Sequence, residues 1–301
     1  MKNVVDGGFI DLLDRLDLNV RELMDGRFGG TRRSKAYGSS PNFADFREYQ
    51  PGDDLRRIDW NLYGRFEKLY LRLYEDERQL HHHIYIDCSA SMDWGTPEKS
   101  WYALRMAVAL SYLGVSAMDR VSVFLLRGGE CLPLMKEERT IVGRDAFYRA
   151  AEAMNRVQFS GDADIGEAVT SNPDKARGGG ISYIISDFMT DSDWKAAAEQ
   201  LRSNRRETVL IQVLARDELT PELSGKLMLL DSETEEEEDE RNMRKEMTRS
   251  AFKAYAAALE WHQNDIHEFC ASRQISFITT VTDIPIEKLL YREAATAGII
   301  K

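Results

Sequence analysis

The segment Ile86-Asp87-Cys88-Ser89-Ala90-Ser91-Met92 places one carboxylate and two hydroxyls close together at the end of an apolar run. On an extended loop, side chains two residues apart point the same way, so Asp87, Ser89 and Ser91 can face one ligand. All three are hard oxygen donors, which suit Mg²⁺ and its near-octahedral coordination. Two of the three are neutral, so an ion bound there stays electrophilic. The spacing therefore predicts a divalent-cation site that an outside carboxylate can complete.

Two further loops supply acids that could belong to the same site. Asp187 follows the predicted buried strand Ile181–Ser186, and Asp164 lies in the loop Gly161–Gly166. In an open α/β sheet, ligands bind beyond the carboxyl ends of the strands, and both Asp87 and Asp187 are expected there. The alternative is that Asp87 and Asp187 only cap turns or helices at the ends of their strands.

These side chains can converge only if strands alternate with helices along the chain. Strands are predicted at residues 83–87, 120–126, 181–186, 208–214 and 276–280, with a hairpin return at 131–135. Helices are predicted at residues 99–118, 144–156, 166–170, 194–203, 248–272 and 286–297. This alternation predicts an α/β fold with a mostly parallel, Rossmann-like sheet and helices on both faces.

Residues 1–80 differ in composition and in hydrophobic pattern from the rest of the chain. They are predicted to form an N-terminal domain, with residues 81–301 as the second domain. Apolar residues at helical spacing predict a helix within residues 1–25, and an exposed basic loop, Arg27–Lys35, follows it. Residues 36–80 are rich in aromatic residues and turn signals, which predicts a small β-rich subdomain.

The segment Tyr49–Trp60, called the box below, combines a Pro51-Gly52 turn with closely spaced charges of both signs. An arginine paired with a carboxylate could lock this turn, with Trp60 packed beneath it. One interpretation is a structural staple that joins the subdomain to the sheet. The other is a partner-binding surface that uses Arg56, Asp59 and Trp60. The sequence does not choose between them.

Composition disfavours several functional classes. The 301 residues carry a formal net charge of −11, which is unfavourable for a general nucleic-acid-binding protein. The three cysteines are widely spaced, which disfavours a disulfide framework. The longest stretch without a charged residue, Met106–Met118, is too short to span a bilayer. We therefore expect a cytoplasmic protein without a membrane span. The acidic run Asp231–Glu240 is expected to be a solvated loop or a docking segment for a basic partner.

Taken together, the Asp87–Met92 pattern resembles the metal-ion-dependent adhesion site of von Willebrand factor A-type domains. Those domains combine Asp-x-Ser-x-Ser with a Thr on a second loop and an Asp on a third. The segment Phe46–Trp60 is similar to the signature of the bacterial domain-of-unknown-function 58 family. Members of that family are von Willebrand A-like and are commonly associated with MoxR-type AAA+ ATPases. The resemblance covers roughly residues 30–290.

The resemblance implies a non-enzymatic adaptor rather than an enzyme. Its implied partners are a MoxR-type AAA+ ATPase and a client protein with an acidic ligand residue, which the chain would help to assemble or activate. The implied ion is Mg²⁺, with Mn²⁺ as a substitute. Ala163 replaces the Thr of the second loop, and alanine cannot bind a metal. The ligands that the resemblance implies are Asp87, Ser89, Ser91, Asp164 and Asp187.

Two alternatives remain open. The first is a Mg²⁺-dependent hydrolase, such as a phosphatase with Asp87 as nucleophile, because carboxylates form covalent intermediates. Ser89 stands where such an enzyme usually has a second Asp. The second alternative is a structural interaction protein whose metal site has decayed through Ala163. Its partner surface would then be the box or the acidic run.

Overall fold

The chain divides into two compact units. One combines residues 1–21 with 80–301 and is called the sheet unit; the other, residues 22–79, is called the small unit. The residues of the predicted metal site lie in the sheet unit, and the box lies in the small unit. The computed structural model describes residues 3–15, 43–51, 53–74, 79–172, 180–204, 206–220, 225–229, 243–247 and 249–290.

The sheet unit is built on a six-stranded sheet in the order β10-β7-β6-β3-β4-β5. Its strands are β3 (His81–Asp87), β4 (Arg120–Arg127), β5 (Glu130–Pro133), β6 (Gly180–Ser186), β7 (Arg206–Leu214) and β10 (Ser276–Val281). All neighbours pair in parallel except β5, which returns antiparallel to β4, so the predicted parallel sheet and hairpin are confirmed. The strand order reverses between β3 and β6, which is where open α/β sheets bind ligands.

The central strands are buried on both faces, which explains their runs of consecutive apolar residues, Ile84–Ile86 in β3 and Tyr183–Ile185 in β6. Ile84 and Ile86 of β3 belong to one hydrophobic cluster, while Tyr85 between them belongs to the other. All seven residues of β6 are buried. Because successive side chains of a strand point to opposite faces, a strand covered on both sides carries apolar residues at consecutive positions.

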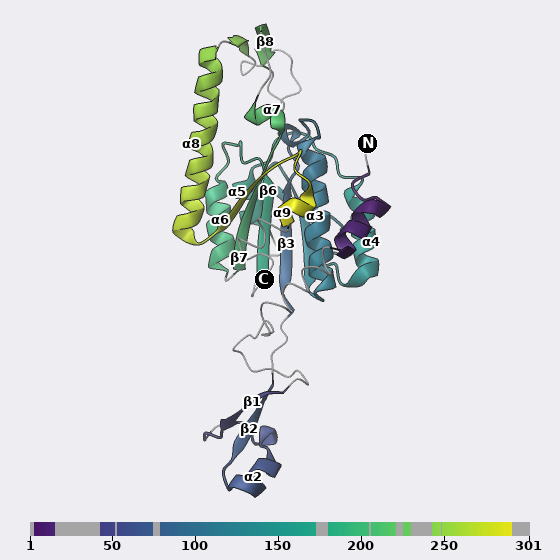
Figure 1. Cartoon of the computed structure of the whole chain (residues 1–301), viewed down its shortest axis with the longest axis vertical. Helices are drawn as coiled ribbons and strands as arrows, with labels where there is room; N and C mark the ends of the chain where they lie inside the picture. Colours follow the sequence, from purple (N-terminus) through teal and green to yellow (C-terminus); the bar gives the residue numbers. More distant parts are fainter. Residues whose placement is uncertain are drawn as a thin grey trace. The chain divides into compact units, whose positions relative to one another are not determined.

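Helices cover the two faces of this sheet (Figure 1). The cluster that contains Ile84 and Ile86 is lined by α3 (Lys99–Ser116), α4 (Gly143–Met154) and α9 (Ile286–Leu289). The cluster that contains Tyr85 is lined by α5 (Ile165–Ser171), α6 (Trp194–Ser203) and α8 (Arg249–Arg273). The fold is therefore the predicted α/β class, consistent with a von Willebrand A-like arrangement.

The N-terminal helix, described over residues 7–15, packs on the sheet unit and not within the N-terminal subdomain where we expected it. Phe9 and Leu13 are buried in the same cluster as α3 and α4. The hydroxyl of Tyr112, on α3, donates a hydrogen bond to Asp14. The apolar stripe of the helix thus finds its partner on a helical face of the sheet unit, which its local sequence does not specify.

Strands β8 (Gly225–Leu229) and β9 (Met243–Met247) form a two-stranded antiparallel sheet that the sequence analysis did not predict. The acidic run Asp231–Glu240 falls outside the described residues, as do the basic loop Arg27–Lys35, residues 16–25 and residues 291–297. Among the helices that are described, we find none with the length and apolar character needed to cross a membrane.

The small unit contains the predicted β-structure together with a helix that was not predicted. β1 (Phe43–Glu48) pairs antiparallel with β2 (Tyr70–Tyr74). Between these strands lie a short 3₁₀ helix, η1 (Leu55–Arg57), and the helix α2 (Trp60–Phe66). The box therefore runs from the end of β1 to the first residue of α2.

Candidate functional site

Asp87 is the last residue of β3, and the residue is 3% exposed. Its Oδ1 accepts the backbone N–H of Ser89 at 2.9 Å, and its Oδ2 accepts the Ser186 hydroxyl at 2.6 Å. Burial raises the pKa of Asp87 above its ordinary value, and the neighbouring Asp187 carboxylate raises it further. Asp87 is thus a fixed carboxylate in a place where a positive charge would be favourable.

Ser89 and Ser91 follow on the loop that leads into the short 3₁₀ helix η2 (Ala90–Met92). Their hydroxyls are hydrogen-bonded to each other, with the two oxygens 3.0 Å apart. Two neighbouring ligands of an octahedral Mg²⁺ ion, each at about 2.1 Å, are separated by about 3.0 Å. The spacing of the two hydroxyls therefore suits two adjacent positions around such an ion.

The loop of residues 160–164 runs beside this first loop. The backbone N–H of Ala90 donates to Gly161 O at 2.8 Å, and that of Ser160 donates to Cys88 O at 3.0 Å. Asp164 stands at the end of the loop, where its Oδ1 accepts the Glu167 N–H at 2.8 Å and caps α5. The two loops predicted to cooperate are therefore neighbours, but one oxygen of Asp164 is used within its own helix.

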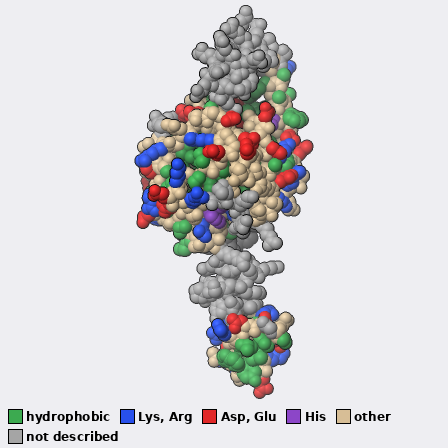
Figure 2. Space-filling model, turned by 180° about the vertical axis from the view of Figure 1, so that it is seen from behind, with side chains coloured by type: hydrophobic (Ala, Val, Ile, Leu, Met, Phe, Trp, Pro, Cys, Tyr) green, Lys and Arg blue, Asp and Glu red, His purple; other side chains and the backbone are tan. Residues whose placement is uncertain are grey.

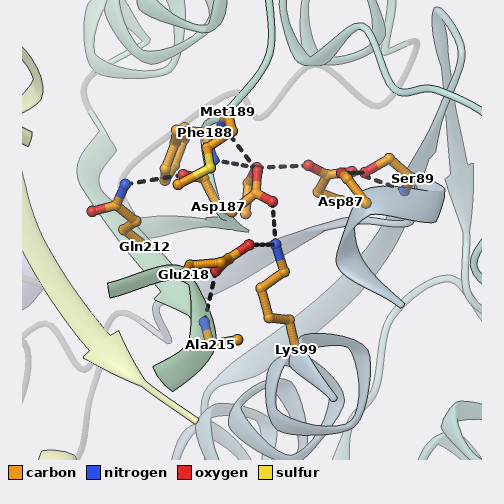
Figure 3. A network of polar contacts seen from close by, with 11 residues as sticks. Asp87, Ser89, Lys99, Asp187, Phe188, Met189, Gln212, Ala215 and Glu218 are labelled. Atoms are coloured by element: carbon orange, nitrogen blue, oxygen red, sulfur yellow. Dashed lines mark hydrogen bonds and ion pairs between the residues drawn. The ribbon is translucent and has the colours of Figure 1, made fainter. Parts of the chain in front are cut away.

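Asp187 follows β6, the strand next to β3, so the sheet brings it beside Asp87 as predicted. The residue is 2% exposed, and each of its carboxylate oxygens has a donor. Oδ1 accepts the Met189 N–H at 2.9 Å, and Oδ2 accepts the ammonium of Lys99 at 2.6 Å (Figure 3).

Lys99 is the site residue that the sequence analysis missed. It is the first residue of α3 and is 1% exposed, and its Nζ also donates to Glu218 Oε1 at 2.5 Å. Glu218 lies on α7 (Arg216–Leu219), directly after β7, and its Oε2 accepts the Ala215 N–H at 2.7 Å. A lysine at the start of a helix opposes the helix dipole, and this unfavourable position was the available signal.

The Lys99 ammonium and its two carboxylates form a buried ion cluster. Burial opposes the charge on Lys99, but the neighbouring Asp187 and Glu218 raise its pKa above the ordinary value. Burial also raises the pKa of Glu218, against the effect of Lys99. With Asp87 included, three carboxyl groups and one ammonium share this edge of the sheet. When all are ionised, the edge carries an excess of negative charge.

With this geometry established, comparisons with known proteins place the chain in a family. The sequence profile described as "Protein of unknown function DUF58" matches residues 45–262. The chain belongs to the DUF58 family. It is 28% identical over 225 residues to uncharacterized proteins of Mycobacterium tuberculosis and Mycobacterium bovis, with 74% of this chain and 70% of each relative covered.

Two solved structures resemble the DUF58 chain at low sequence identity. One is the conserved hypothetical protein BatB from Bacteroides thetaiotaomicron, with a TM-score of 0.43, 13% identity and coverage of 73% of this chain and 99% of that chain. The other is an aerotolerance-related membrane protein from Bacteroides fragilis, with a TM-score of 0.42, 15% identity and coverage of 72% and 99%.

The residues of this DUF58 chain fit a divalent ion in part. Asp87, Ser89 and Ser91 provide a carboxylate and two suitably spaced hydroxyls. Ala163, at the position expected for Thr, is buried among apolar side chains and offers no ligand atom. Asp187 is paired with Lys99. No group of three or more His, Cys, Asp or Glu side chains suited to a metal ion occurs in the described part of the chain. The first loop, Asp87 to Ser91, is not such a group, because two of its three candidate ligands are serine hydroxyls.

In the box, Asp59 has a structural position. It is 5% exposed, and its Oδ1 accepts the N–H groups of Asn61 and Leu62, which caps α2. Its Oδ2 accepts Arg72 Nε at 2.7 Å, so Asp59 also ties α2 to β2. The Arg72 guanidinium lowers the pKa of Asp59 below its ordinary range. These contacts give Asp59 a structural role in the small unit, and its predicted role in partner binding stays a prediction.

Trp60 is exposed, whereas the sequence predicted that it would be buried beneath the turn. It is 64% exposed instead of packed beneath the turn, because it lies on α2, a helix in which no residue is buried. The turn itself is closed by Asp53, which accepts Arg47 at 2.7 Å and the Gln50 N–H at 2.9 Å. Arg56 is exposed. Of the three predicted partner residues, Arg56 and Trp60 thus remain available at the surface.

Proposed function

We propose that this chain is a non-enzymatic interaction module that binds an acidic side chain of a partner protein at the carboxyl end of its sheet, with the help of Mg²⁺. Asp87, Ser89 and Ser91 would bind the ion, which supplies a positive charge open to a further carboxylate. The observation that supports this most is the 3.0 Å separation of the two serine hydroxyls beside the Asp87 carboxylate, at the switch point of the sheet.

The local contacts favour binding over hydrolysis. A nucleophilic carboxylate must reach the reacting atom of its substrate. Asp87 is buried, and both of its oxygens accept hydrogen bonds that fix its orientation. We therefore expect no turnover of a generic phosphoester that depends on Asp87. If the wild type hydrolyses such a phosphoester and the Asp87→Asn variant does not, that result would instead support a hydrolase.

A second surface supports a role in protein binding. Leu55, Trp60, Tyr63 and Phe66 of the small unit, called the aromatic surface below, are 58%, 64%, 45% and 62% exposed. Figure 2 shows hydrophobic side chains gathered on one face of this unit. Contiguous exposed apolar groups of this kind are typical of interaction sites. With the family resemblance, this surface leads us to propose a MoxR-type AAA+ ATPase as one partner and a client with an acidic ligand residue as the other.

The metal part of the proposal is tested by calorimetric titration of Mn²⁺ and Mg²⁺ into metal-free protein. We expect binding by the wild type and a loss of about tenfold or more in affinity for Asp87→Ala. The matched control is Asp162→Ala, which removes an exposed acid from the neighbouring loop. If the wild type binds no ion, or if Asp87→Ala binds it as tightly, the chain is an interaction protein with a decayed metal site.

The partner part is tested by capture of a purified MoxR-type ATPase from the source organism on immobilised protein. We expect Trp60→Ala/Phe66→Ala to reduce capture strongly. Tyr148→Ala, which removes a similarly exposed aromatic side chain from α4, should leave capture unchanged. Equal capture by all three proteins would show that the aromatic surface does not contact this ATPase.

A further inference from the structure

The position of Lys99 depends on a close approach between two segments that flank the site. Gly95 precedes α3 and has a positive φ of 98°, and a Cβ atom there would lie 2.5 Å from the Cβ of Ala215. This contact brings the start of α3 against the end of β7, and α7 follows directly. Glu218 on α7 can therefore reach the Lys99 ammonium, which lies between Glu218 and Asp187 (Figure 3).

Hydrogen bonds to Asp187 and Glu218 hold the Lys99 ammonium in one position. Two of its three N–H donors go to carboxylates at 2.6 and 2.5 Å, which are the short distances of charge-assisted hydrogen bonds. Each carboxylate is itself oriented by a backbone N–H, from Met189 for Asp187 and from Ala215 for Glu218. A buried charge requires such compensation, and here both ion partners are supported.

We infer that the Lys99 ammonium is the permanent counter-ion of Asp187. While Lys99 is in place, Asp187 is therefore not a ligand for a divalent ion. A divalent ion would then rely on Asp87, Ser89 and Ser91, and an acidic side chain from the partner would add a further ligand. Lys99 thereby decides which half of the predicted ligand set is available, and the partner's carboxylate would strengthen the binding of the ion. This last consequence rests on the proposed function; the role of Lys99 at Asp187 does not.

The charge of the cluster agrees with this role. Asp87, Asp187 and Glu218 together leave an excess of two negative charges over Lys99 when all are ionised. That excess equals the charge of one divalent ion. Without the ammonium, the same ion would face a larger excess of carboxylates and would attract a partner carboxylate less. Lys99 thus keeps the first loop electrophilic although two other acids lie nearby.

The inference is tested by Mn²⁺ titration in two backgrounds. In the wild-type background, Asp187→Asn should preserve Mn²⁺ binding, with the affinity lowered only by the loss of one nearby negative charge. In the Lys99→Met/Glu218→Gln background, Asp187 is released, and we expect Mn²⁺ affinity to rise by about tenfold or more. Adding Asp187→Asn to that background should abolish the gain. The Gln side chain keeps an oxygen that can accept the Ala215 N–H, so α7 retains its cap.

Either of two results would overturn the inference: loss of Mn²⁺ binding in the single variant Asp187→Asn, or no gain of affinity in Lys99→Met/Glu218→Gln. A wild type that binds no Mn²⁺ would contradict the proposed metal site but not the role of Lys99, which the gain in the second background still tests. The two failures are therefore distinguishable.

A labelling experiment on the wild type covers the case in which the charge variants do not fold. Amine acetylation followed by mass spectrometry should leave Lys99 unmodified, both without and with saturating Mg²⁺. Lys195 provides the comparison, because its ammonium pairs with Asp265 but its side chain is 39% exposed. If Mg²⁺ makes Lys99 reactive, the ion displaces the ammonium from Asp187, and the inference fails.

Discussion

The ammonium of Lys99 lies 2.6 Å from Asp187 Oδ2, although 88 residues of chain separate the two. The contact joins the start of α3 to the end of β6, on the edge of the sheet where Asp87 also lies. A buried carboxylate is therefore neutralised by a side chain at the place where a metal ligand was expected. The arrangement has consequences for stability as well as for binding.

Replacing Lys99 by Met is expected to lower the free energy of unfolding by about 3–5 kcal/mol, because two buried carboxyl groups lose their counter-charge. Urea denaturation of both proteins measures the difference. Lys195→Met is the matched control, since the side chains of its ion pair with Asp265 are 39% and 36% exposed, and the pair should contribute about 0–1 kcal/mol. A loss for Lys99→Met as small as that of the control would mean that the cluster is not electrostatically important.

Gly95→Ala should lower the free energy of unfolding by roughly 2–4 kcal/mol, from a strained positive φ together with a clash against Ala215. Gly161→Ala is the control. Gly161 also has a positive φ, of 68°, but an added Cβ would meet no atom within 4 Å, so only the backbone cost of about 1–2 kcal/mol applies. Equal losses in thermal denaturation would show that the approach of Gly95 to Ala215 is not tight.

His83 should make the protein less stable in mild acid. Burial lowers its pKa from 6.5 to about 2, so the imidazole is neutral in the folded state, while the unfolded chain binds a proton below pH 6.5. Stability from this residue is present above that pH and declines as the pH falls, by about 2 kcal/mol at pH 5. Urea denaturation at neutral pH and at pH 5 measures the decline, which should be smaller in His83→Phe.

The exposed His267 supplies the control for this experiment. The variant His267→Gln should keep the full pH dependence of the wild type. If His83→Phe and His267→Gln show the same dependence, the acid sensitivity arises elsewhere in the chain.

Cys88 lies inside the first loop but should be chemically inert in the folded protein. Burial raises the pKa values of Cys88 and Cys270 to about 12, which removes the reactive thiolate. Cys131 is less buried. Alkylation followed by mass spectrometry should therefore modify Cys131 first, and Cys88 and Cys270 only after unfolding. Rapid modification of Cys88 in the native protein would contradict its burial.

Much of the sheet unit could be predicted from local patterns. Short, wholly apolar runs such as Tyr183-Ile184-Ile185 indicated strands buried on both faces, and helix α6 begins and ends at the predicted residues, 194 and 203. Asp87 and Asp187 were predicted to meet because parallel strands that neighbour each other bring their carboxyl ends to one edge. Alternation and spacing are properties of short segments, so they can be read without knowing the fold.

Contacts between distant segments could not be predicted in this way. The apolar stripe of residues 7–15 predicted a helix but not its packing against α3 and α4. In the box, the charges predicted a locked turn but not which arginine would pair with Asp53. Whether Trp60 would be buried depended on the packing of α2. The prediction took the locking charges from within the box, but the arginines that pair with Asp53 and Asp59 are Arg47 and Arg72, which lie outside it.

The sequence by itself determined the α/β architecture and the first loop, Asp87 to Ser91, because both follow from periodicity and from residues close together in the chain. Only the tertiary structure decided what surrounds that loop. Lys99 and Glu218 are 119 residues apart and meet because α3 and α7 begin at the same edge of the sheet. The charge and ligand set of the site therefore depend on long-range packing, which no local pattern encodes.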